Sequence, residues 1–224
     1  MTDLLAYARD LEAEDSGLAE AIAEIEALRR QASELRGRAR HALEFLARLP
    51  EALAAASAAR EEAAAELERR LAEAAEAEAR LERAEQEEAV LAARRAVVRT
   101  RDVASGAERK VARLRADQEA LDAEARAVEA ELPELDRVGA ELAVRLGAVP
   151  RAPQAGVPAR GAAGVAAWAS RAEASLFVAR GGLETERERV IRQANELAAA
   201  ALGEPLAASS VSRVREQLER LGSA

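Results

Sequence analysis

The first 49 residues carry apolar side chains at a seven-residue spacing, in two interleaved sets. The sets are residues 4, 11, 18, 25, 32, 39 and 46, and residues 7, 14, 21, 28, 35, 42 and 49, and Glu14 alone among them is charged. Such a heptad repeat keeps its apolar residues on one side of a helix, where they need a partner helix to cover them. The pattern predicts a helix over about 2–49, with Leu28 and Leu35 in a helix–helix core.

The same heptad frame continues more weakly to about residue 99, with ten of fourteen positions apolar. Pro50 is predicted to end the first helix, because proline has no amide proton to donate. Over 104–149 the repeat is strong again but in another frame, with twelve of fourteen positions apolar.

The step between these two frames, from Val98 to Ala104, is six residues, and the sequence Ser105 to Glu108 fits a helix-capping box. We therefore expect the chain to reverse at 99–105, between helices over about 50–99 and 105–149. The alternative is one helix over 50–149 that contains a stutter and a kink at Pro133.

Proline and glycine are concentrated in residues 150–164, which predicts a flexible or extended linker. Helical spacing resumes over 165–224. We expect two helices there, about 165–180 and 184–202, or one helix hinged at Gly181 and Gly182. A short last helix should follow Ser210, with an apolar face made of residues 211, 214, 218 and 221.

The predicted fold class is therefore all-α, with no β-sheet. Residues 1–149 are expected to form a long antiparallel coiled-coil bundle of three helices, residues 150–164 the linker, and residues 165–224 a C-terminal helical segment. That segment either completes a four-helix bundle or forms a separate head. Its candidate anchors for a partner helix are Trp168, Leu176 and Phe177.

Charge is distributed in blocks along a chain whose net charge is −8. Residues 1–26 hold one arginine and eight acids, whereas a basic band over 94–115 holds eight bases and two acids. The bases of this band are Arg94, Arg95, Arg99, Arg101, Arg109, Lys110, Arg113 and Arg115. Three helices folded up, down and up would bring the two blocks together, so we interpret the band chiefly as the structural complement of the acidic block.

The alternative interpretation of the basic band is a contact for nucleic-acid phosphates or anionic lipid. No aromatic residue is interleaved with these bases to stack on nucleobases. Lys110 is the only lysine in the chain, and we attribute the excess of arginine and alanine to the base composition of the genome.

The chemistry expected of enzymes is missing from the sequence. There is no cysteine, and His41, the single histidine, is expected at the surface. Zinc and di-iron sites need more histidine or cysteine than this chain has. The single histidine is not accompanied by the Gly-x-Ser-x-Gly elbow of a serine hydrolase, and no phosphate-binding glycine loop is present. We therefore expect no catalytic residues, cofactor, metal or small-molecule substrate. No apolar run approaches 18 residues, so we expect a cytoplasmic protein that does not span a membrane.

Three functional hypotheses follow from these features. The first is a structural coiled-coil protein, acting as scaffold, adaptor or self-assembling subunit through helix–helix pairing with itself or another helical protein. The second is a membrane-surface protein of the phage-shock or ESCRT-III-like kind, which the chain resembles in size, acidity and hairpin layout. Its acidic residues 1–26 differ from the basic amphipathic helix that binds membranes. The third is a chromosome-associated coiled coil that uses the basic band.

Overall fold

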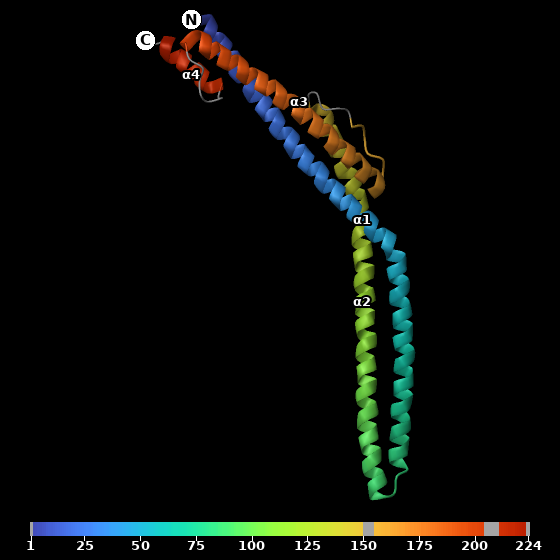
Figure 1. The fold of residues 1–224 in the computed structure, drawn as a ribbon. Helices are drawn as coiled ribbons and strands as arrows, with labels where there is room; N and C mark the ends of the chain where they lie inside the picture. The colour runs from blue at the N-terminus through green and yellow to red at the C-terminus, as the bar shows by residue number, and fades with distance from the viewer. Residues whose placement is uncertain (1, 150–154, 204–210, 223–224) are drawn as a thin grey trace. The chain divides into compact units, whose positions relative to one another are not determined.

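The computed structural model describes residues 2–149, 155–203 and 211–222, and within these ranges the protein is all helical, without a β-strand. The helices are α1 (Thr2–Glu82), α2 (Glu87–Ala148), α3 (Ala162–Leu202) and α4 (Val211–Gly222), as Figure 1 shows. The predicted all-α fold class is thus confirmed. The chain divides into two compact units, one made of residues 1–41 with 132–224, and the other of residues 42–131.

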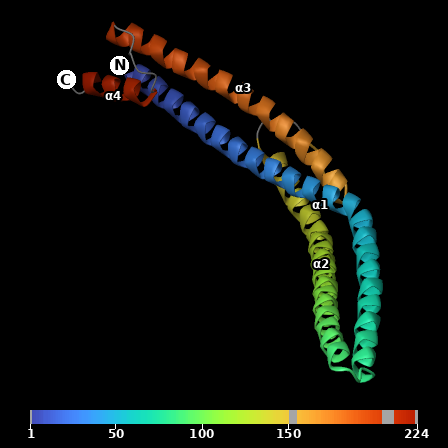
Figure 2. The ribbon, with the colours of Figure 1, turned by 60° about the horizontal axis from the view of Figure 1, so that its bottom comes forward.

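The unit of residues 42–131 is a helical hairpin. The second part of α1 and the first part of α2 run side by side in opposite directions (Figures 1 and 2). Residues 83–86 connect them, and the amide of Ala84 donates a hydrogen bond to the Leu81 carbonyl at 3.2 Å. Glu87 and Glu88 follow in the first turn of α2, where their negative charge favours the helix N-terminus.

The reversal predicted at 99–105 is therefore wrong, and the chain reverses at 83–86 instead. Helix α2 continues without interruption through Gly106. The alternative prediction, one helix over 50–149, is right that the helix continues past 99–105. It is wrong about where that helix begins, which is at Glu87. The prediction that Pro50 ends the first helix is also wrong, because α1 continues through it to Glu82.

The heptad pattern itself explains where the reversal lies. When the frame of residues 104–149 is extended backwards, it passes through Val90, Ala93, Val97 and Thr100. All four are buried or half-buried. The frame therefore changes at the 83–86 turn, whereas Leu91 and Val98, which the earlier frame placed in the core, are exposed.

The other unit has its main core where α1, α2 and α3 meet. Leu28 and Leu35 of α1 are buried there, which confirms the predicted core positions. Gly139 of α2 marks the meeting point. A Cβ atom at Gly139 would lie 3.7 Å from Leu35 Cδ2 of α1, 3.7 Å from Val165 Cγ1 of α3 and 3.1 Å from Pro158 Cγ.

The described part of the predicted linker is held by hydrogen bonds. The indole Nε1 of Trp168 donates to the Gly156 carbonyl at 2.9 Å, and the Gly161 amide donates to the Asp136 carboxylate at 2.7 Å. Gly161 has φ 85°, which favours glycine, and it directly precedes α3. The C-terminal helix therefore begins at Ala162, slightly before the predicted 165, while residues 150–154 lie outside the described residues.

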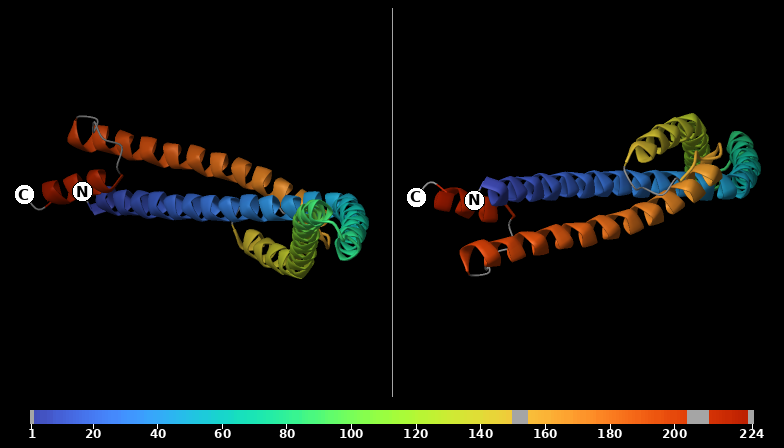
Figure 3. Two further views of the ribbon diagram at one scale, coloured as in Figure 1. Left: turned by 90° about the horizontal axis from the view of Figure 1, so that it is seen from below. Right: turned by 90° about the horizontal axis from the view of Figure 1, so that it is seen from above.

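Helix α3 is continuous through Gly181 and Gly182, so the two-helix expectation for 165–202 is wrong. A second core joins it to the N-terminal end of α1 and to α4, which lie together in both views of Figure 3. This core contains Ala8 and Leu11 of α1, Val190, Ala194, Leu197 and Ala198 of α3, and Val211, Val214 and Leu218 of α4. The apolar face predicted for the last helix is confirmed, except that Leu221 is exposed.

Candidate functional site

The basic band lies on the α2 side of the hairpin, and all eight of its side chains are exposed. Arg101 forms an ion pair with Glu78 of α1 at 2.7 Å, and Arg113 and Arg115 pair with Asp117 and Glu119 of their own helix. The Nε atom of Arg109 donates to the Ser105 carbonyl at 3.3 Å. Within the described ranges, the other four bases make no ion pair: Arg94, Arg95, Arg99 and Lys110.

Three exposed apolar side chains, Leu91, Val98 and Val103, lie beside or within this band, and the first two share one face of α2. Leu91 and Val98 are 51% and 62% exposed. They are seven residues apart, so they project from the same face of α2. Arg94 and Arg95 are three or four residues from each of them and lie between them on that face. The result is a mixed apolar and basic surface near the 83–86 end of the hairpin.

Helix α1 contributes another apolar side chain to the same edge of the hairpin. Leu71 is 46% exposed and shares its heptad position with Glu78, seven residues further on. Glu78 pairs with Arg101, and Arg101 is three residues from Val98 on α2. Leu71 and Val98 therefore flank one edge of the hairpin, which we call the open edge and define by Leu71, Leu91 and Val98.

The α1 stretch beside the basic band has the opposite charge. Residues 60–80 contain seven glutamates and four arginines. Several of these charges are neutralised within the helix, as Glu66 is by Arg69 and Arg70 at 2.6 and 2.7 Å. Glu61, Glu62 and Glu68 make no ion pair with any described residue. Over this part of the hairpin, unneutralised acids therefore outnumber unneutralised bases on α1, and the reverse holds on α2.

The acidic residues 1–26, expected to complement the basic band, instead form their ion pairs with arginines of α3 and α4. Arg180, Arg187 and Arg189 of α3 pair with Glu26, Asp15 and Glu14 at 3.2, 2.8 and 2.8 Å. Asp15 raises the pKa of Arg187 through a hydrogen bond. The acidic block is therefore matched by arginines of the C-terminal helices and not by the basic band.

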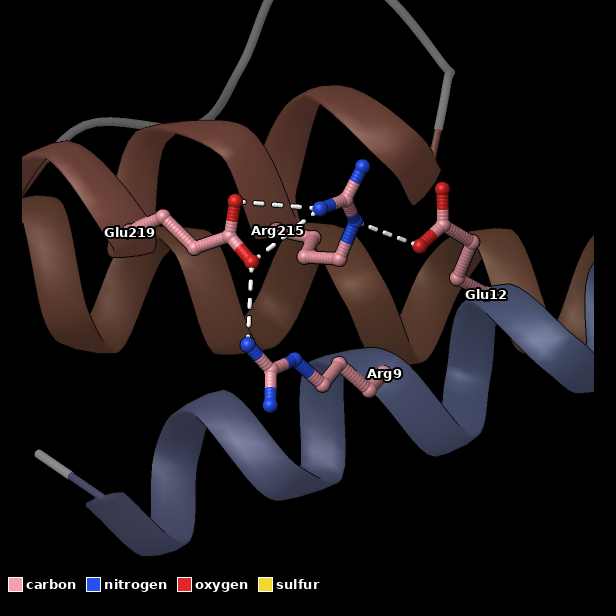
Figure 4. A network of polar contacts seen from close by, with 4 residues as sticks. All are labelled: Arg9, Glu12, Arg215 and Glu219. Atoms are coloured by element: carbon pink, nitrogen blue, oxygen red, sulfur yellow. Dashed lines mark hydrogen bonds and ion pairs between the residues drawn. The ribbon is translucent and has the colours of Figure 1, made fainter.

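Figure 4 shows the corresponding network between α1 and α4. Arg215 of α4 forms ion pairs with Glu12 of α1 at 2.5 Å and with Glu219 of its own helix at 3.0 Å, and Glu219 also pairs with Arg9 at 3.2 Å. The hydrogen bonds from Arg9 and Arg215 lower the pKa of the Glu219 carboxyl below its usual value.

The three candidate partner anchors have different environments. Trp168 and Leu176 have no exposed surface, so both are core residues and neither is accessible to a partner. Phe177 is 60% exposed, and the guanidinium carbon of Arg29 lies 5.3 Å from the centre of its ring. This distance is typical of a cation–π contact.

A shallow cavity of about 280 Å³ lies between α1 and α3, lined by Glu26, Arg29, Arg30, Ser33, Glu173 and Arg180. Arg180 is paired with Glu26 and Glu184, while Glu173 is paired with Arg36 of α1 at 2.6 Å. The two remaining bases of the lining, Arg29 and Arg30, make no ion pair with a described residue, and Arg29 lies over the Phe177 ring.

His41 is exposed, as expected. No cluster of three or more candidate metal ligands occurs among the described residues. None of the described helices has a stretch that is both long and apolar enough to cross a membrane. Comparison of the chain with known protein families, with curated proteins and with solved structures finds no match.

Proposed function

We propose that this chain is a non-enzymatic structural protein, a scaffold, adaptor or self-assembling subunit that works by helix–helix pairing. Its pairing element is the hairpin of residues 42–131, which acts as a coiled-coil arm. The other unit folds around its own buried side chains.

The observation that supports this proposal is the poor packing of the hairpin. The ten largest side chains with no appreciable exposure all lie in the other unit: Trp168, Ile25, Leu28, Leu35, Leu135, Leu176, Leu218, Val165, Val190 and Val214. The buried residues of the hairpin are five alanines and two valines, namely Ala42, Ala63, Ala74, Ala77, Val97, Ala104 and Val128.

This composition has an energetic consequence. Burying a leucine or valine side chain contributes about 1.5–3 kcal/mol, whereas the single methyl group of alanine contributes about 0.8 kcal/mol. The leucines of the hairpin seam, among them Leu67, Leu81, Leu114 and Leu121, are only half-buried and so gain only part of this free energy. Leu71, Leu91 and Val98 remain exposed to solvent. Further helices packed on the open edge would bury these side chains, which is the usual means by which amphipathic helices are stabilised.

A capture experiment tests the proposal directly. The full chain, immobilised, is used to capture proteins from the cells that produce it, in parallel with the double variant L91E/V98E. A second variant, V144E, places one glutamate at an exposed valine of the other unit and serves as the control. We expect the bound proteins to be lost with L91E/V98E and kept with V144E. Identical sets of proteins on all three would contradict a pairing role for the hairpin.

A second candidate function is contact with an anionic surface through the basic band, either lipid or nucleic acid. Arg94, Arg95 and Arg99 support it, since no described acid neutralises them. Co-sedimentation with anionic vesicles and with DNA at two salt concentrations tests it, because electrostatic binding weakens as salt screens the charges. We favour helix pairing because acidic residues of α1 lie beside the band and the whole chain has a net charge of −8.

A further inference from the structure

We propose that the open edge of the hairpin is covered by the hairpin of a second copy of this chain. The two hairpins lie parallel, with the 83–86 turn of one beside the 83–86 turn of the other, and form a four-helix bundle. This inference rests on the proposed function, because it names the partner of the same pairing surface.

The positions of the exposed apolar side chains favour a parallel pair. Five large apolar side chains of this unit are exposed, and the three that define the open edge, Leu71, Leu91 and Val98, lie toward the 83–86 end of the hairpin. The other two are Leu43 and Val103. In a parallel pair, the three side chains of one copy meet those of the other and leave solvent together. In an opposed pair, each set would lie at the far end of the partner hairpin, away from its counterpart.

Charge complementarity also favours this arrangement. A twofold axis along the hairpin places α2 of each copy beside α1 of the other at the same level. The basic band of residues 94–115, with eight bases and two acids, then borders residues 60–80 of the partner, with seven acids and four bases. Arg94 and Arg95 gain acidic neighbours, and Glu61 and Glu68 gain basic ones.

An opposed pair would also bring unlike charges together, since residues 116–131 contain six acids and one arginine. Charge alone therefore does not distinguish the two alignments, and the apolar residues decide between them. A polyanion is a less suitable occupant than a second copy, because the glutamates of α1 would repel it at the same level of the hairpin.

The mass of the full chain in solution tests the association. One chain weighs 23.8 kDa, so light scattering should give about 48 kDa, falling to the single-chain mass on dilution. L91E/V98E should remain at the single-chain mass over the same concentrations, because pairing would bury four carboxylates per dimer. V144E should behave as the unchanged chain. Circular dichroism shows whether each variant keeps its helices.

The alignment is tested by an electron-spin distance between copies. Because the chain has no cysteine, Gln86→Cys places a single nitroxide label at the turn of the hairpin. A parallel pair should give a label-to-label distance below about 40 Å. An opposed pair should give roughly 65 Å, from 44 residues at about 1.5 Å each.

Each outcome decides the inference. A single-chain mass at all concentrations overturns it, as does the longer spin distance. It is also overturned if single chains sediment with anionic vesicles or DNA and L91E/V98E does not. If the chain is a monomer but L91E/V98E still loses captured proteins, the second copy is excluded and the proposed function remains. If L91E/V98E has the same mass as the unchanged chain and captures the same proteins, both the pairing with a second copy and the proposed function are wrong.

Discussion

The substitution Leu28→Ala measures how much the α1–α2–α3 core contributes to folding. Leu28 has no exposed surface, and the change removes three carbon atoms. At about 0.8 kcal/mol per carbon, the lost transfer free energy is about 2.4 kcal/mol. The cavity left in a closely packed core adds to this, so we expect the free energy of unfolding to fall by about 3–4 kcal/mol.

Leu4→Ala is the matched control, because it makes the same chemical change in the same helix. Leu4 is 38% exposed, so only part of the transfer free energy is lost and solvent fills the space. We expect a loss of about 1.5 kcal/mol. The two variants should therefore differ by about 2 kcal/mol, since their change in helix propensity is the same.

Urea denaturation followed by tryptophan fluorescence is the appropriate assay. Trp168 is the only tryptophan, and it lies fully buried in the same unit as Leu28. Its signal therefore reports unfolding of that unit, and the midpoint and slope give the free energy of unfolding. If Leu28→Ala destabilises the unit no more than Leu4→Ala does, the heptad frame of α1 and the core built on it are wrong.

Three further outcomes are expected. Gly106→Ala should stabilise the hairpin by about 0.5–1 kcal/mol in thermal melts, because no atom within 4 Å obstructs the new methyl group in α2. Gly139→Ala should destabilise its unit, since the methyl group would lie 3.1 Å from Pro158 Cγ; a gain equal to that of Gly106→Ala would refute this close packing. The pKa of Glu219 is lower in the folded chain than in the unfolded chain, so the ionised carboxyl stabilises the fold. This stability is complete above the pKa of the unfolded state and is lost as the pH falls through the pKa of the folded state. Between pH 6 and about pH 3, the melting temperature of E219Q should therefore decrease less than that of the unchanged chain. An equal decrease would exclude this linkage.

The local helical character and the main core follow from the sequence by itself. Alanine, leucine, glutamate and arginine favour helix at nearly every position, and the heptad spacing decides which face is buried. Along α1, the residues at the predicted spacing from Ile25 to Ala42 are buried without exception: Ile25, Leu28, Ala32, Leu35, Ala39 and Ala42. The face of α4 was equally predictable, since Val211, Val214 and Leu218 recur at helical intervals.

The position of the chain reversal was not predictable in the same way. Adjacent apolar pairs, Val90 with Leu91 and Val97 with Val98, fit two heptad frames equally well. The 83–86 turn contains neither glycine nor proline, while Gly106 and Pro50 lie inside helices. Local propensities of about 1–3 kcal/mol for such residues are outweighed where a long helix packs against its neighbour on both sides of them.

The candidate site also depends on where the chain reverses. The sequence showed two blocks of opposite charge, residues 1–26 and 94–115, but charge alone does not say which segments meet. Reversal at 83–86 places the basic band beside residues 60–80, and the acidic block forms its ion pairs with Arg187 of α3 and Arg215 of α4. The register in which the helices lie side by side determines which charged residues are neutralised and which stay exposed. A shift of the turn by a few residues changes every such neighbour, while the helices themselves remain the same.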